Sequence, residues 1–140
     1  MPFVHIHIAG GEIAASQIQQ LQTQATHLMA AIMGKQAELT AVLVEHTSEA
    51  CWSVGGETVR VAAHLDVKVT AGTNTPEEKA AFIAAANQLF KDTLDQELPL
   101  ATYVVVHEIA ADTWGYDGCT QAARRAANSL RAPHPQPGAI

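Results

Sequence analysis

The chain has 140 residues, of which 48% are hydrophobic and 16% charged, so it can bury a core and does not have the composition of a disordered protein. Its formal net charge of −6 argues against nucleic acid as a partner. No apolar run approaches the roughly 18 residues that a membrane helix needs, and no positively charged leader precedes the first strand. We therefore expect a cytoplasmic protein with no membrane partner. Cys51 and Cys119 are isolated thiols that we expect to be reduced.

The first half of the chain predicts a buried strand, a glycine turn, an amphipathic helix, a second apolar strand and a loop. Apolar residues at helical spacing define the helix, and Gly34 follows it at the place of a left-handed cap. The second strand is too hydrophobic to have an exposed face. In chain order these five elements span residues 2–8, 10–11, 14–33, 39–44 and 45–56.

The second half predicts the same elements in the same order. Its helix opens with a capping box at Thr75 and a proline at the first helical position. The two halves superpose at an offset of 62 residues, which places Gly10 on Gly72 and Trp52 on Trp114. The strand, turn, helix, strand and loop of this half span residues 59–70, 71–74, 75–94, 102–106 and 110–118.

A helical crossover makes the two strands of each β-α-β unit parallel, with a right-handed connection. We therefore expect an α+β fold (an α/β two-layer sandwich) with a four-stranded sheet and two helices on one face. One domain over residues 1–131 would comprise repeats 2–58 and 59–121 and a short helix over 120–130; residues 132–140 would be a disordered tail. Nothing left in the sequence covers the other sheet face, so we predict self-association, with three sheets around a common axis.

Pro2 is the first candidate functional residue. If Met1 is removed, which a small second residue favours, Pro2 becomes a secondary amine with a reference pKa of roughly 8. The apolar strand that follows would hold this amine inside the fold, as a proton-transfer base requires. The alternative is that Met1 stays and Pro2 only starts a strand, a position where proline is tolerated. The residues alone leave both alternatives open.

With its proline start and doubled β-α-β pattern, the chain resembles the tautomerase superfamily, and its length resembles the fused relatives of 4-oxalocrotonate tautomerase. The resemblance covers about residues 2–121. The segments that carry it are Met1–Ile8, Gly10–Gly11, Trp52–Glu57, Thr75–Lys79 and Trp114–Gly118.

The resemblance implies a tautomerase, an isomerase that needs no cofactor and works as a homotrimer. Pro2 would be the general base for keto–enol tautomerisation of a small 2-oxo acid or enol. Desolvation by the surrounding strands would lower the pKa of the amine and keep it neutral near pH 7. The partner would be a small anionic or enol substrate.

The family's two anion-binding arginines are missing from this sequence. The first falls on Gly11 and Glu12 in the first half and on Thr73 and Asn74 in the second; the second falls on Ala41 and Tyr103. Members similar to macrophage migration inhibitory factor have a tyrosine at the last of these positions, and the family's aromatic wall residue falls on Trp52 and Trp114. Tyr103 and Trp114 are therefore the expected pocket walls. Thr73, Asn74 and the nearest cation, Lys68, complete the expected substrate-binding residues.

The missing arginines motivate one alternative, a catalytically silent binding member of the fold. A further alternative is a Pro2-dependent hydratase or decarboxylase acting on a small carboxylic acid, although the missing arginines weigh against the decarboxylase branch of the family too. A metal site is not assigned. His5 and His7 share one face of a strand, but the sequence offers no evident third ligand beside them.

Overall fold

The computed structural model describes residues 2–131, so the predicted tail over 132–140 lies outside the described residues. The chain forms two compact units, Met1–Glu108 and Ile109–Ile140. The expectation of one domain over 1–131 stays a prediction. Within the described part, no helix combines the length and the hydropathy that crossing a membrane requires.

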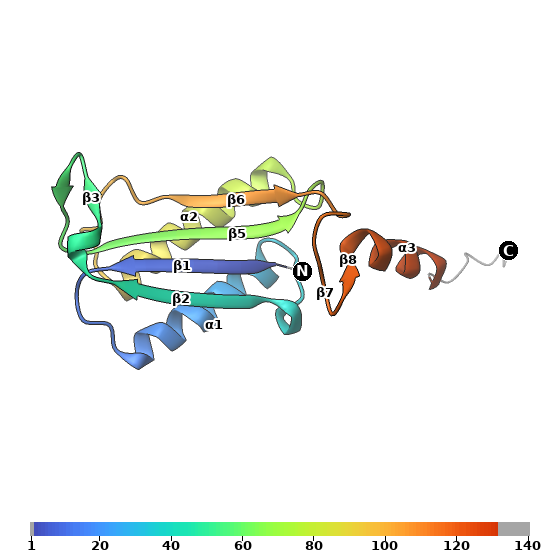
Figure 1. Ribbon diagram of the computed structural model, residues 1–140, viewed down its shortest axis with the longest axis horizontal. Coiled ribbons are helices and arrows are strands. Elements are labelled where there is room, and N and C mark those ends of the chain that lie inside the picture. Colours follow the sequence, from blue (N-terminus) through green and yellow to red (C-terminus); the bar gives the residue numbers. More distant parts are fainter. Residues whose placement is uncertain (1, 132–140) are drawn as a thin grey trace, which may run out of the picture. The chain divides into compact units, whose positions relative to one another are not determined.

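A four-stranded sheet in the order β2-β1-β5-β6 forms the first unit (Figure 1). β1 pairs in parallel with β2, across the helical crossover, and antiparallel with β5, which begins the second repeat. Figure 1 shows β5 and β6 running in the same direction. The predicted four-stranded sheet and both β-α-β units are confirmed. The strands are β1 Phe3–Ala9, β2 Ala41–Thr47, β5 Ala62–Thr70 and β6 Val104–Ile109.

Strand boundaries differ from the predicted ones where short 3₁₀ segments and turns intervene. A 3₁₀ turn, η1 (Ala37–Leu39), delays the start of β2 to Ala41, and β2 then runs on to Thr47. Both predicted loops contain short hairpins, which their glycine turns allow. The first loop also holds the 3₁₀ turn η2 (Glu49–Cys51). The hairpin strands are β3 Ser53–Val54, β4 Glu57–Thr58, β7 Gly115–Tyr116 and β8 Cys119–Thr120.

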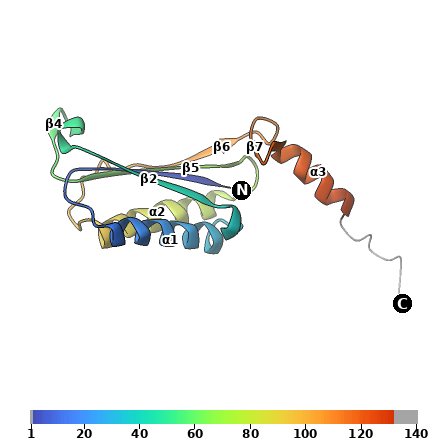
Figure 2. The ribbon, with the colours of Figure 1, turned by 60° about the horizontal axis from the view of Figure 1, so that its bottom comes forward.

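Two helices, α1 (Ala15–Ala31) and α2 (Pro76–Thr93), cover the same face of the sheet, as Figure 2 shows. The side chains of β1 alternate, and those that point toward the helices are fully buried. Gly34 has a φ of 67°, so its predicted role as a left-handed residue after α1 is confirmed. The core includes Val4, Ile6, Ile8, Leu21, Met29, Leu65, Val67, Phe82 and Phe90.

The sheet face away from the helices, called the open face here, carries histidines and charged residues as well as apolar ones. Paired residues on neighbouring strands share a face. Because the single chain leaves these side chains half-buried or exposed, this face is available to a partner surface. Its side chains are Phe3, His5 and His7 on β1, Ala41, Leu43 and Glu45 on β2, and His64, Asp66 and Lys68 on β5.

In the second unit, the β7–β8 hairpin leads into α3 (Gln121–Arg131), close to the predicted helix over 120–130. The guanidinium of Arg124 stacks on the ring of Tyr116 at 3.8 Å from its centroid. It also donates a hydrogen bond of 2.9 Å to the Tyr116 carbonyl oxygen. These contacts fix the helix to its own hairpin.

The turn after β1 gives a matched test of local packing. Gly10 has a φ of 76°, and a Cβ there would lie 2.1 Å from the carbonyl oxygen of Arg60. Gly11 has a φ of 64°, with open space around it. We expect Gly11→Ala to lower the free energy of unfolding by about 1 kcal/mol, the cost of a left-handed alanine. Gly10→Ala should cost about 3 kcal/mol or more, because a backbone clash adds to the strain. Urea unfolding followed by tryptophan fluorescence measures both, and equal losses would contradict this packing.

The start of α2 gives a second test. The predicted capping box is present: Glu78 N–H donates to Thr75 Oγ1 over 3.1 Å, and Thr75 N–H donates to Glu78 Oε1 over 2.8 Å. We expect Thr75→Ala to cost about 1 kcal/mol of stability at pH 7. The Thr75 N–H also holds the pKa of Glu78 below its ordinary 4.5. This carboxylate therefore stabilises the fold above pH 4.5, and the contribution disappears as pH falls below the lowered pKa.

The start of α1 gives the converse test. Ala14 has no side-chain cap there, so Ala14→Ser should raise the free energy of unfolding in the same urea assay.

Candidate functional site

Pro2 lies at the start of β1, one of the two inner strands of the sheet. Its side chain is fully buried, on the same face as Val4 and Ile6. Its carbonyl oxygen accepts a hydrogen bond of 3.3 Å from the Ala41 N–H, which fixes the strand start against β2. The nitrogen of Pro2 is therefore held at the edge of the hydrophobic core. This is a setting that disfavours a charged amine.

Lys68 lies near the same end of the sheet, because β5 runs antiparallel to β1. Its register partner is Phe3, and its ammonium nitrogen stands 5.4 Å from the centroid of the Phe3 ring. The Lys68 side chain is exposed on the open face, whereas the Pro2 ring points to the helix side. Measured along β1, Lys68 therefore lies one residue away from Pro2, on the other face of the sheet. A small anion bound at this end can contact the ammonium group.

Thr73 and Asn74 form the turn that follows β5, at this same end. Asn74 Nδ2 donates a hydrogen bond of 2.9 Å to the Met33 carbonyl oxygen at the end of the first helix. Lys35 Nζ donates to Thr73 Oγ1 over 2.8 Å. Both predicted residues therefore hold the turn against the first helix. Their side chains already have partners before any substrate arrives.

Glu108, at the end of β6, also faces this turn. Lys79 binds its carboxylate at 2.6 Å, and the hydrogen bond and positive charge of Lys79 hold the pKa of Glu108 below its usual range. The Gly72 backbone adds a further hydrogen bond. Lys79 is thus neutralised by an acidic partner and contributes little to anion binding.

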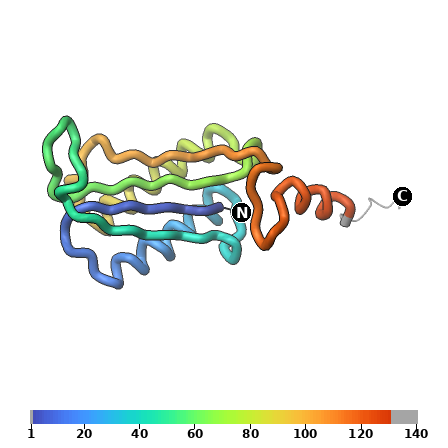
Figure 3. Tube along the Cα trace, in the orientation of Figure 1, coloured from blue at the N-terminus to red at the C-terminus, as the bar shows by residue number. Residues whose placement is uncertain are grey.

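Tyr103 lies just before β6, beside the middle of β5 and away from the Pro2 end of the sheet. Its carbonyl oxygen accepts a hydrogen bond of 3.1 Å from the N–H of Leu65, the β5 residue that pairs with Ile6, and its side chain is 65% exposed. Figure 3 shows the segment of β6 running toward the end of the sheet where β1 begins. Trp114 belongs to the second unit, where its carbonyl oxygen accepts a hydrogen bond from the Gln121 N–H. Within the first unit, the structure brings Lys68 and the turn toward the Pro2 end but not Tyr103.

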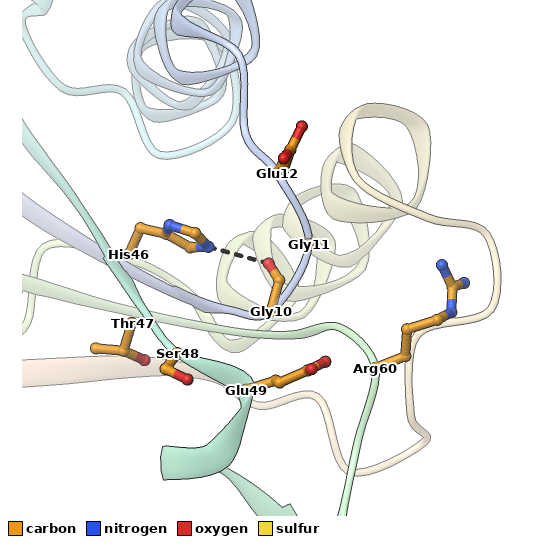
Figure 4. Close-up of a pocket in the computed structure, with 8 residues that line it drawn as sticks. All are labelled: Gly10, Gly11, Glu12, His46, Thr47, Ser48, Glu49 and Arg60. Carbon is orange, nitrogen blue, oxygen red and sulfur yellow. Dashed lines mark hydrogen bonds between the residues drawn. The ribbon is translucent and has the colours of Figure 1, made fainter.

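A cavity of about 500 Å³ lies at the end of the sheet where β1 and β2 finish (Figure 4). Arg60, just before β5, contributes a guanidinium group to it. A smaller adjoining cavity of about 210 Å³ shares Arg60 and adds Asp95. The larger cavity is lined by Gly10, Gly11, Glu12, His46, Thr47, Ser48, Glu49 and Arg60.

Arg60 is the candidate that the sequence analysis missed. It forms an ion pair with Asp95, whose pKa is held below its usual range by the Glu97 N–H and then by Arg60 itself. The Arg60 side chain is nevertheless 73% exposed, so further N–H donors can reach a ligand. It stands beside Gly11 and Glu12, the first-half positions of the missing arginine. The sequence analysis placed Arg60 inside the predicted strand over 59–70, whereas β5 begins at Ala62. Its position beside the turn after β1 follows from the antiparallel pairing of β1 with β5, which a local sequence pattern does not reveal.

The cavity around Arg60 carries both signs of charge. Glu12 and Glu49 line it together with Arg60, and His46 Nε2 donates a hydrogen bond of 3.0 Å to the Gly10 carbonyl oxygen (Figure 4). One guanidinium beside two carboxylates can orient a single carboxylate or an enol. It disfavours a dianion, because like charges at close range repel.

The Pro2 end and the Arg60 end are separated by the length of β1. This strand has 7 residues, which span about 20 Å at roughly 3.3 Å per residue. A small molecule cannot contact both ends of one sheet. These two groups of residues act on one ligand only when a second chain brings them together.

The family model for tautomerase enzymes matches this chain twice, at residues 2–62 and 64–124. The two matches are offset by 62 residues and confirm the predicted repeat. Among curated proteins, "Probable tautomerase K2" of Dickeya dadantii (strain 3937) is 36% identical over 59 residues. That alignment covers 42% of this chain and 88% of the relative.

Solved structures share the fold of the whole double unit. The protein Pt0534 inactivated by 2-oxo-3-pentynoate matches with a TM-score of 0.79 and 18% identity, over 87% of this chain and 98% of that one. A wild-type fused 4-OT described as a symmetric trimer matches with a TM-score of 0.76 and 23% identity, over 87% and 98%. Two family matches over most of the sequence, on two β-α-β units in one sheet, establish that this chain belongs to the tautomerase enzyme family.

Proposed function

We propose that this protein catalyses keto–enol tautomerisation of a small 2-oxo acid or its enol, with Pro2 as the general base. The observation that carries the proposal is the full burial of Pro2 at the start of an inner strand. Burial favours the neutral form of an amine, and a neutral amine is the form that accepts a proton. The mechanism requires removal of Met1, because an amide nitrogen is not a base.

The reaction needs only a proton transfer within one substrate. The Pro2 nitrogen removes the proton from the enol oxygen, the electron pair moves through the conjugated system, and the resulting ammonium returns the proton to carbon. The reverse direction begins at a carbon next to the carbonyl. No cofactor, oxidant or water is consumed, and the base is regenerated in each cycle. The apolar surroundings of Pro2 limit exchange of that proton with bulk water.

We further propose that the active form is a homotrimer. In one chain, Tyr103 and Arg60 lie away from the Pro2 end of the sheet, so a complete site needs these residues of one chain beside the Pro2 of another. The open face is available for such an assembly. A related fused 4-OT of the same fold is described as a trimer, which supports this arrangement.

The charges around Arg60 favour a substrate with one carboxylate. Arg60 supplies a guanidinium for that carboxylate, while Glu12 and Glu49 repel a second one. The related Pt0534 is inactivated by 2-oxo-3-pentynoate, a 2-oxo acid with a single carboxylate. We therefore propose a monoanionic substrate, in contrast to the dianions that a pair of arginines accommodates. Lys68 is the alternative anion ligand, at the Pro2 end.

The base is tested by Pro2→Ala. Intact-mass measurement first establishes that Met1 is absent from the wild-type protein. We expect wild type to ketonise phenylenolpyruvate, and Pro2→Ala to lose about 10²-fold to 10⁴-fold in kcat/KM, the usual contribution of a positioned base. Circular dichroism and size-exclusion chromatography check that fold and assembly are unchanged. Turnover that survives in Pro2→Ala would show that another group is the base.

The anion site is tested by Arg60→Ala against Lys68→Ala. Loss of a charge-assisted hydrogen bond costs about 1.5–3 kcal/mol, or roughly tenfold to a hundredfold in binding. We expect Arg60→Ala to raise KM for phenylenolpyruvate by at least tenfold, with a smaller change in kcat. Wild type should also prefer this monoanion over the dianion 2-hydroxymuconate. An increase in KM confined to Lys68→Ala would assign carboxylate binding to Lys68.

A catalytically silent binding protein is the second candidate, favoured by Glu12 and Glu49 in the cavity where the family pattern calls for positive charge. It predicts no turnover of either enol by correctly processed wild type, together with saturable binding of the same compounds by calorimetry. Turnover that depends on Pro2 would exclude it.

A further inference from the structure

His5, His7 and Glu45 form a compact group on the open face, away from both ends of the sheet discussed above. Alternation along β1 places the two histidines on the same face. β2 runs parallel beside it, and Glu45 is the register partner of His7. The third potential metal ligand, which the sequence does not reveal, thus comes from the neighbouring strand.

The three side chains converge. Nε2 of His5 lies 2.9 Å from Oε1 of Glu45, and the two imidazole rings are 6.0 Å apart between centroids. One ligand atom from each of the three residues lies within 4.8 Å of the other two. Ligands about 2.1 Å from a tetrahedral zinc ion lie about 3.4 Å from one another. Small rotations of these side chains would therefore bring all three onto one ion.

His7 gives an independent indication of a ligand. Its Nε2 atom is buried and has no hydrogen-bond partner among the described residues. The ring of Trp52 packs against it edge-on, with centroids 5.9 Å apart. A buried nitrogen with an unused donor or acceptor needs an explanation. In neutral imidazole, one ring nitrogen carries the lone pair that binds a metal, so coordination would supply the missing partner.

We propose that His5, His7 and Glu45 bind one divalent transition-metal ion per chain, with Zn²⁺ as the preferred ion. Two imidazoles and one carboxylate are a donor set that suits zinc, whereas Mg²⁺ and Ca²⁺ favour oxygen ligands. A water molecule or a group from a neighbouring chain completes the coordination. The site lies apart from Pro2 and does not depend on the proposed tautomerase activity.

Metal binding by Glu45 and the Nε2 atom of His5 replaces the 2.9 Å contact between them. The groups facing the site from β5 are Asp66 and His64, the register partners of His5 and His7. His64 Nε2 lies 3.3 Å from Asp66, so it is engaged in a separate pair on the same face. His64 is therefore a matched control histidine.

The test uses full-length protein without an affinity tag, freed of metal by a chelator. Isothermal titration with Zn²⁺ at pH 7.5 should give one site per chain. We expect His7→Ala and the near-isosteric Glu45→Gln each to weaken Zn²⁺ binding at least a hundredfold, while His64→Ala changes it less than threefold. Circular dichroism of each variant checks its fold, and Glu45→Gln keeps the test decisive if His7→Ala is unstable.

A second readout comes from Trp52, because it contacts His7. In a Trp114→Phe background Trp52 is the single tryptophan, since the sequence contains 2. Saturable quenching of its fluorescence by Co²⁺, reversed by Zn²⁺ and absent in Glu45→Gln, would support the site. Equal Zn²⁺ affinity in wild type, Glu45→Gln and His64→Ala would overturn it, as would Zn²⁺ binding lost only in His64→Ala.

Discussion

The antiparallel pairing of β1 with β5 is the contact on which the rest of the structure depends. It joins the two β-α-β units into one sheet, and its central pair, Ile6 and Leu65, is fully buried under the helices. It also makes β1 an inner strand, so that β2 and β5 hold the start of β1, and with it Pro2, from both sides. A β-α-β unit alone would leave this strand with one free edge and its apolar side only partly covered.

This pairing also decides which residues can work together. Because β1 and β5 run in opposite directions, the turn after β5 lies near Pro2, while Arg60 and the glycine turn after β1 lie at the far end. The chain therefore places Pro2, the proposed base, at one end of its sheet and the Arg60 cavity, the proposed anion site, at the other. In an assembly that packs the Pro2 end of one chain against the Arg60 end of another, the two groups of residues would form one site. The layout therefore links the proposed chemistry to self-association.

Much of the architecture follows from local pattern. The alternation in β1, the capping box at Thr75 and the left-handed Gly34 depend on neighbours within a few residues, so the sequence predicts them correctly. Strand ends and hairpins were less predictable. β2 runs on to Thr47 because its partner β1 still offers hydrogen bonds there, and pairing between distant strands is not visible in a local pattern.

By itself the sequence determined the doubled β-α-β unit, the helical face and the position of Pro2 at the start of a buried strand. These features are repeated or periodic, and periodicity is a property of the chain alone. Only the tertiary structure decided that Arg60 stands beside Gly11 and that Glu45 meets His5. Both contacts cross between strands, and their existence depends on strand order and register. Those are set by the packing of the whole sheet, because a shift by one residue would turn each side chain to the opposite face.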